Sequence, residues 1–206
     1  MGIPNNIPCG NCMLIAVTQS NVWFIEELFR HDDVKKYYVL RDDHAANIRS
    51  FCQYIVNSNI QNDSLNYIIF NDYGDEVGFI SAEPVMNRAT GMPMWNVGYA
   101  VHPAHRRKGY ASSAVTGLSN YLLQNFSFQQ VMLDICEENI ASTNVAKKCG
   151  FSKPDDRTGY FDMEHPEIGM RFRWFKQLAG NRTVLFNQAV HFYRQNKYAK
   201  PARQQL

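Results

Sequence analysis

The sequence has neither a long hydrophobic run nor an excess of charge of one sign. None of its apolar stretches approaches the roughly 20 residues that a membrane helix needs, so we expect no membrane span. Its 21 basic and 19 acidic residues give a net charge of +2, which is too balanced for the basic face of a nucleic-acid-binding protein. With 206 residues, of which 45% are hydrophobic, the chain can bury a core without disulfides or metal ions.

Cysteine is also scarce, and the five cysteines do not have the spacing of a secreted disulfide framework. Cys9 and Cys12 form a CxxC pair, but no second pair of ligands completes a zinc site, so we interpret them as free thiols and expect no metal ion. Segment 1–17 lacks the charged and apolar regions of a secretory signal, and Asn6 stands where a myristoylation pattern needs Ser or Thr. We therefore expect a cytoplasmic protein.

Repeats, low-complexity tracts and linkers are absent as well, which predicts one main domain. Apolar runs predict strands at 13–17, 65–70, 77–82, 95–101, 131–135 and 170–175, and helical spacing predicts helices at 21–30, 47–56, 110–126, 139–149 and 181–198. Early strands followed by a strand–helix–strand–helix unit predict a mixed α/β (α+β) fold around one sheet. We expect a flexible N-terminal tail over 1–12, the domain over 13–176 and a C-terminal helical extension over 177–206.

The most informative segment is GYAVHPAHRRKGYASSAV, residues 98–115. Strand 95–101 ends before Pro103, and a basic loop with one glycine, Gly109, leads directly into helix 110–126. Backbone N–H groups of such a loop and of the first helical turn converge on one volume and favour an anion. The loop lacks both the GKS or GKT ending of a Walker loop and the three glycines of a dinucleotide fingerprint. On these residues alone, a solvated basic turn is the alternative.

The pattern RxxGxA at residues 106–111 resembles the pyrophosphate-binding motif of the GNAT superfamily of acyl-CoA-dependent N-acetyltransferases. Its context agrees with that family, because strand 131–135 follows, and then NIAS at 139–142 and KCGF at 148–151. Asn-x-x-Ser followed by Lys-x-Gly-Phe resembles the branch that contains the ribosomal-protein-alanine N-acetyltransferases.

GYAVHP at residues 98–103 and the stretch 29–37 resemble the same branch, so the resemblance covers about residues 13–176. It implies a mostly antiparallel central sheet flanked by helices, to which this chain adds a C-terminal helix. It also implies acetyl-CoA as co-substrate.

The resemblance further implies where acetyl-CoA binds. Strands 95–101 and 131–135 would splay apart and leave backbone N–H groups for the pantetheine and the thioester. The implied cofactor-binding residues are Ala100 and Val101 on the strand, Arg106, Arg107 and Lys108 beside the phosphates, Gly109, Tyr110 and Ala111 through their amides, and Asn139 through its side chain. Asn139 is equally a natural N-cap of helix 139–149, and the sequence leaves both roles open.

Two features of the family are absent from this chain. Residues 145–148 contain no tyrosine to act as an acid toward the departing thiolate, and strand 95–101 carries no acidic residue. Ser142 lies one turn after Asn139 and can donate to the sulfur, the alternative being a first-turn serine that only satisfies the helix backbone. Asp134 lies on the polar face of strand 131–135 and can take the proton of the amine through water, the alternative being a surface acid.

The resemblance implies an enzyme that transfers the acetyl group of acetyl-CoA to a primary amine by direct attack on the thioester. The amine would belong to a protein N-terminus or to a small molecule. A non-catalytic acyl-CoA sensor of the same fold is the alternative, and a structural protein that binds a partner through its tail helix is a third possibility. Expected partners are acetyl-CoA, an amine acceptor and a second copy of the chain, without nucleic acid or membrane.

Overall fold

One eight-stranded sheet organises the described part of the chain, in the order β1-β2-β3-β4-β5-β6-β8-β7. The computed structural model describes residues 3–38, 40, 47–86, 93–128, 130–153, 160–161 and 171–177. The strands are β1 (Asn6–Cys9), β2 (Cys12–Ala16), β3 (Leu65–Asn71), β4 (Glu76–Met86), β5 (Pro93–Val101), β6 (Gln130–Cys136), β7 (Tyr160–Phe161) and β8 (Arg171–Gln177). Neighbouring strands are antiparallel except β5 and β6, which confirms the mixed, mostly antiparallel sheet.

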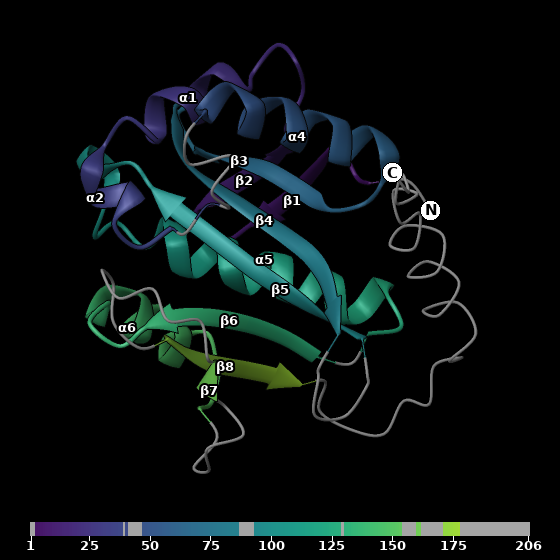
Figure 1. Cartoon of the computed structure of the whole chain (residues 1–206), viewed down its shortest axis with the longest axis vertical. Helices are drawn as coiled ribbons and strands as arrows, with labels where there is room; N and C mark the ends of the chain where they lie inside the picture. Colours follow the sequence, from purple (N-terminus) through teal and green to yellow (C-terminus); the bar gives the residue numbers. More distant parts are fainter. Residues whose placement is uncertain are drawn as a thin grey trace, which may run out of the picture.

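Helices cover both faces of this sheet (Figure 1). They are α1 (Trp23–Leu28), α2 (Asp32–Lys35), α4 (Ile48–Gln61), α5 (Tyr110–Asn125) and α6 (Ile140–Lys148), with a 3-10 turn, η1 (Pro103–His105). On one face, Leu28 of α1 and Ile55 of α4 share a core with Phe79 of β4. On the other face, Leu118 and Leu122 of α5 share a separate core with the sheet. The two cores confirm the prediction of a central sheet flanked by helices.

Helix starts follow the capping residues of the sequence. Asn47 caps α4, because its side-chain oxygen accepts from the N–H groups of Arg49 and Ser50 at 3.1 and 3.3 Å. The helix runs past the predicted end at residue 56 and ends at Asn62, which adopts a left-handed conformation with φ 58°. Helix α5 begins after Gly109, as the sequence predicts.

The expected flexible tail over 1–12 is wrong for residues 6–9. These residues form β1, which pairs with β2 and places Cys9 opposite Cys12. The prolines at positions 4 and 8 concealed the strand, since proline lacks the N–H that a ladder needs. Strand β1 lies at the edge of the sheet, where that loss is tolerated. At the other end, β8 extends to Gln177, and the predicted helix 181–198 lies outside the described residues.

The cysteines are free thiols, as predicted, and all five are buried. Burial raises the pKa of Cys9 to about 11 and that of Cys12 to about 12, so both stay protonated at neutral pH. They act as small apolar side chains in the core beneath α5. In the described ranges, no helix has the length and apolar character to span a bilayer.

The contact between β1 and α5 gives a stability prediction. A Cβ atom on Gly117 of α5 would lie 2.8 Å from Cys9 Cβ and would also collide with Cys9 Sγ. We expect Gly117→Ala to lower the free energy of unfolding by about 1–3 kcal/mol, as overpacked cores do. If residues 6–9 were an unstructured tail, Gly117→Ala would instead raise the free energy of unfolding, because alanine is more favourable than glycine in a helix by about 1 kcal/mol. Urea denaturation measures the difference, and adding Cys9→Ala, which removes the colliding sulfur, should restore part of the loss.

Candidate active site

The parallel strands β5 and β6 pair over only a short stretch and then separate. Their register contains the pairs Trp95–Val131 and Asn96–Met132, whereas β6 stays paired with β8 along its whole length. Figure 1 shows the two strands fanning apart, with α6 beside the open end. A cavity of about 1770 Å³ occupies this region. The predicted divergence of strands 95–101 and 131–135 is therefore present.

The register of β5 decides which backbone groups face the opening. The N–H of His102 donates to the carbonyl of Val77 on β4, at 2.9 Å. Because hydrogen-bonded pairs alternate along an antiparallel ladder, the N–H of Ala100 also faces β4, and those of Tyr99 and Val101 face the opening. Of the two predicted backbone contacts, Val101 is thus available and Ala100 is turned away. The N–H of Tyr99 faces the opening instead of that of Ala100, although Tyr99 was not among the predicted site residues.

The loop between β5 and α5 presents a continuous row of backbone donors. In the described parts of the chain, nothing accepts a hydrogen bond from the N–H groups of residues 107–112. Arg107 and Gly109 both have positive φ, 63° and 87°, which curls the backbone before the helix starts. Successive N–H groups in such a curl, together with the helix N-terminus, form a concave site for an anion. Gly109, Tyr110 and Ala111, the predicted cofactor-binding residues of the loop, all line the cavity.

A side chain from the first hairpin supports this loop. Asn11, in the turn between β1 and β2, donates from Nδ2 to the carbonyl of Lys108 at 3.0 Å. The side chains of Arg107 and Lys108 are exposed. Arg106 is held differently from the prediction, because its guanidinium pairs with Asp33 at 3.0 Å and donates to the Val101 carbonyl at 3.2 Å. The structure therefore directs Arg106 toward α2 and the end of β5.

Two histidines join α2 to the same loop. His31 Nε2 and His102 Nε2 lie 2.9 Å apart, and His102 Nδ1 accepts from the N–H of Ala104 at 3.3 Å. Because a neutral imidazole has one donor and one acceptor, His102 must donate from Nε2 to an unprotonated His31 Nε2. Burial lowers the pKa of His102, and the neighbouring His31 and His105 lower it further. In the described residues, no three His, Cys, Asp or Glu side chains gather as metal ligands.

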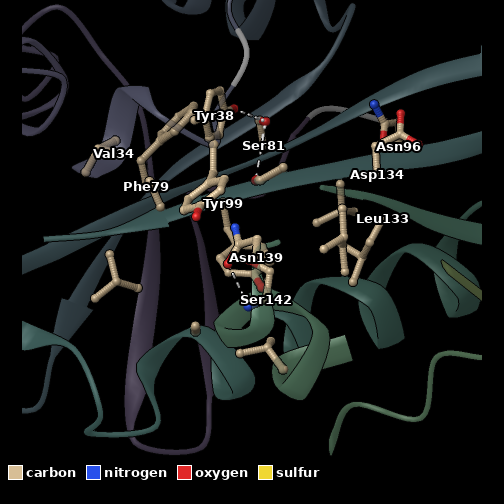
Figure 2. Close-up of a pocket in the computed structure, with 18 of the residues that line it drawn as sticks. Val34, Tyr38, Phe79, Ser81, Asn96, Tyr99, Leu133, Asp134, Asn139 and Ser142 are labelled. Carbon is tan, nitrogen blue, oxygen red and sulfur yellow. Dashed lines mark hydrogen bonds between the residues drawn. The ribbon is translucent and has the colours of Figure 1, made fainter. Parts of the chain in front are cut away.

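Asn139 and Ser142 lie at the start of α6 on the edge of the cavity (Figure 2). The side-chain oxygen of Asn139 accepts from the N–H of Ser142 at 3.1 Å, which confirms the capping role. This contact leaves the Nδ2 of the amide for another partner and fixes the first turn of α6. The Ser142 side chain is half-buried, and its hydroxyl faces Tyr99 of β5 closely enough to lower the pKa of that phenol.

Carboxylates line the cavity on the other face of the sheet. Asp134 lies on the face of β6 opposite Val131 and Leu133, as the alternation predicted. Pairing in register places Asn96 beside Glu83 of β4, and Asn96 Nδ2 donates to Glu83 Oε1 at 3.5 Å. Glu83 was not among the predicted site residues, because the predicted strand ends at residue 82 whereas β4 continues to Met86. The continued alternation through Pro84 and Val85 was the available signal.

On the same face, Tyr38 follows α2 and reaches over the sheet. Its hydroxyl lies 3.0 Å from Ser81 Oγ, and Ser81 donates to the Gly98 carbonyl at 3.5 Å (Figure 2). Burial raises the pKa of Tyr38 well above its ordinary value, so this phenol stays neutral. The cavity thus has a basic loop at one end, neutral hydroxyls in the middle and carboxylates on the far face.

The histidine contact predicts a loss of stability in acid. The pKa of His102 is lower in the folded protein than the ordinary value of about 6.5, so the unfolded chain binds more protons below that pH. The stabilising contribution is complete above about pH 6.5 and disappears as the pH falls through the folded-state pKa. We expect His102→Asn, which keeps an acceptor for Ala104, to flatten the fall of the melting temperature between about pH 7 and pH 5. His105→Asn keeps the pair and should retain most of the slope.

Comparisons with known proteins agree with this geometry. A family profile described as "Acetyltransferase (GNAT) domain" matches residues 14–152, more than half of the chain. Curated protein sequences gave no significant match.

Solved structures share the fold at low sequence identity. An acetyltransferase of the GNAT family from Bacillus anthracis superposes with a TM-score of 0.65 at 18% identity, over 84% of this chain and 98% of that one. The ribosomal-protein-S5-alanine acetyltransferase from Vibrio fischeri gives 0.66 at 15% identity, over 84% and 96%. Spermidine N-acetyltransferase from Vibrio cholerae, solved with CoA and spermine, gives 0.62 at 14% identity, over 81% and 95%. The likeness shows the fold, and the profile match shows that the chain belongs to the GNAT family of acetyltransferases.

Proposed function

We propose that the cavity binds acetyl-CoA and transfers its acetyl group to a primary amine. The observation that carries this proposal is the opening between β5 and β6, which leads to the row of free N–H groups at 107–112. A pyrophosphate needs several hydrogen-bond donors on one concave surface. This loop offers several backbone N–H groups, and no described residue accepts a hydrogen bond from them. Bound acetyl-CoA would supply an activated thioester, and the chain would supply binding, orientation and proton transfer.

The loop and β5 would bind different parts of acetyl-CoA. The amides of Gly109, Tyr110 and Ala111 would hold the pyrophosphate, with the exposed Arg107 and Lys108 beside it. The outward N–H groups of Tyr99 and Val101 would hold the pantetheine along the edge of β5. Asn139 would add its Nδ2, which capping leaves available.

The acceptor would enter from the face that carries the carboxylates. A primary amine is mostly protonated at neutral pH, so Glu83 and Asp134 attract the cation to the far side of the thioester. Attack needs the neutral amine, and Asp134 would take the released proton through water. The related folds acetylate a ribosomal protein and spermidine, according to their names, and both acceptors are amines.

Ser142 would act on the departing sulfur. When the amine displaces the thiol, the carbon–sulfur bond breaks and its electron pair goes to sulfur. A hydroxyl in the first turn of α6, fixed by the Asn139 cap and lining the cavity, can donate to that sulfur. The contact strengthens as negative charge develops, and such contacts contribute a few kcal/mol to the transition state.

A non-catalytic acyl-CoA sensor is the alternative function, favoured by the missing helix tyrosine in residues 145–148. Incubation with acetyl-CoA and a panel of primary amines separates the two. An enzyme yields an acetylated amine, detected by mass spectrometry, at the same rate as free thiol. A sensor binds acetyl-CoA but releases thiol at the uncatalysed rate with every amine.

Gly109→Glu tests the anion site. The new carboxylate would repel the pyrophosphate, so we expect acetyl-CoA binding to be lost in calorimetry while the protein stays folded. Gly74→Glu is a matched control, because Gly74 also has a positive φ, 86°, and lies in the β3–β4 turn with open space around it. Unchanged affinity in a folded Gly109→Glu protein would overturn the assignment of the loop.

Ser142→Ala tests the proton donor. We expect turnover to fall by roughly tenfold to a thousandfold, the scale of one acid–base or charge-stabilising contact, with little change in acetyl-CoA affinity. Ser50→Ala is the control, because Ser50 holds the same position after the Asn47 cap of α4 and is exposed away from the cavity. Turnover of Ser142→Ala within about twofold of the wild type would leave Ser142 as a capping-turn residue only.

A further inference from the structure

A half-buried tyrosine of β5, Tyr99, lies against the proposed proton donor. Alternation along β5 puts the Tyr99 side chain on the face covered by α5 and α6, where it packs on that core. Ser142 reaches the same place from the first turn of α6, and both side chains line the cavity. Figure 2 shows Tyr99, Asn139 and Ser142 gathered at one point of the pocket.

The Tyr99 hydroxyl is buried and without a hydrogen bond of standard geometry to any described residue. A buried hydroxyl without such a bond is unusual, because its desolvation is then not compensated. Burial raises the pKa of Tyr99 to about 12, and the nearby Ser142 opposes part of that rise. The phenol therefore stays protonated at neutral pH and acts as a hydrogen-bond donor rather than as a base.

Of the two side chains near the Tyr99 phenol, Ser142 is the better hydrogen-bond acceptor. The backbone N–H of Ser142 is used by the Asn139 cap, but its hydroxyl has one proton and two lone pairs for other partners. The buried Cys149 also lies near the phenol, but its thiol donates to the Ser112 carbonyl at 3.4 Å and its sulfur is a weak acceptor.

We propose that Tyr99 is the positioning residue for Ser142, an inference that rests on the proposed function. With acetyl-CoA bound, the phenolic O–H donates to Ser142 Oγ, which turns the proton of the serine toward the thioester sulfur. Tyr99 thereby replaces, from the neighbouring strand, the tyrosine that is absent from residues 145–148.

The proton balance of the step is complete with the groups present. The amine forms its bond to the acetyl carbon, the carbon–sulfur bond breaks, and sulfur takes the electron pair and the Ser142 proton. While that proton moves, the Tyr99 hydrogen bond stabilises the charge that develops on Ser142 Oγ. Water returns a proton to Ser142, and the proton lost by the amine passes to water through Asp134, so Tyr99 itself keeps its own proton.

Tyr99→Phe tests this inference, because it removes the hydroxyl and keeps the packed ring. We expect kcat to fall about ten- to hundredfold, with the Kd of acetyl-CoA within about twofold of the wild type. In the Ser142→Ala background, the same change should have almost no further effect, since the hydroxyl would have lost the group through which it acts. Tyr67→Phe is the matched control, because Tyr67 of β3 also has a buried hydroxyl without a hydrogen bond to any described residue, and it lies outside the cavity. Its kcat should equal that of the wild type.

Three results would overturn the inference while acetyl transfer by the wild type keeps the proposed function intact. The first is a kcat of Tyr99→Phe within about twofold of the wild type. The second is a loss that multiplies fully with that of Ser142→Ala, which would show that the two hydroxyls act independently. The third is a loss of acetyl-CoA affinity equal to the loss of kcat/KM, which would make Tyr99 a binding residue. Melting temperatures of all variants verify the fold.

Discussion

The early end of pairing between β5 and β6 is the constraint on which the rest of the site depends. At the closed end, beside the pair Trp95–Val131, Trp95 packs edge-on against Phe126 and at a tilt of 39° against Phe128, with ring centroids 5.0 Å apart in both cases. Beyond the next pair the strands diverge, and half of the backbone donors of β5 lose a partner. An opening of this kind in the middle of a sheet would be costly if it stayed dry. It becomes useful when a ligand with its own polar groups fills it.

Two sets of contacts support loop 102–109 at the end of this opening, and both come from the first 35 residues. The β1–β2 turn braces it through the contact of Asn11 with the Lys108 carbonyl, and β1 itself packs closely on Gly117 of α5. Helix α2 braces the opposite side through the His31–His102 contact and the Asp33–Arg106 ion pair. The N-terminal segment thus supports the proposed cofactor site, although none of its residues belongs to the loop motif.

Local signals allowed much of the fold and part of the site to be predicted. The loop motif, the Asn139 cap and the alternation of β6 depend on residues close together in sequence, and each appears in the structure as expected. The closeness of Tyr99 to Ser142 could not be predicted, because these residues belong to two elements whose relative position depends on the strand divergence. Strand β1 was missed for a different reason, since proline at an edge strand looks like a loop in sequence.

In the proposed reaction, acetyl-CoA and the amine meet across the sheet at the opening between β5 and β6. A crystal structure of the protein with acetyl-CoA tests this most directly. We expect the pyrophosphate on the N–H groups of residues 107–112, the pantetheine along the open edge of β5, and the thioester sulfur beside Ser142. The acetyl carbon should face the side of Glu83 and Asp134. Acetyl-CoA bound elsewhere, or bound with its thioester away from the gap between β5 and β6, would contradict the account.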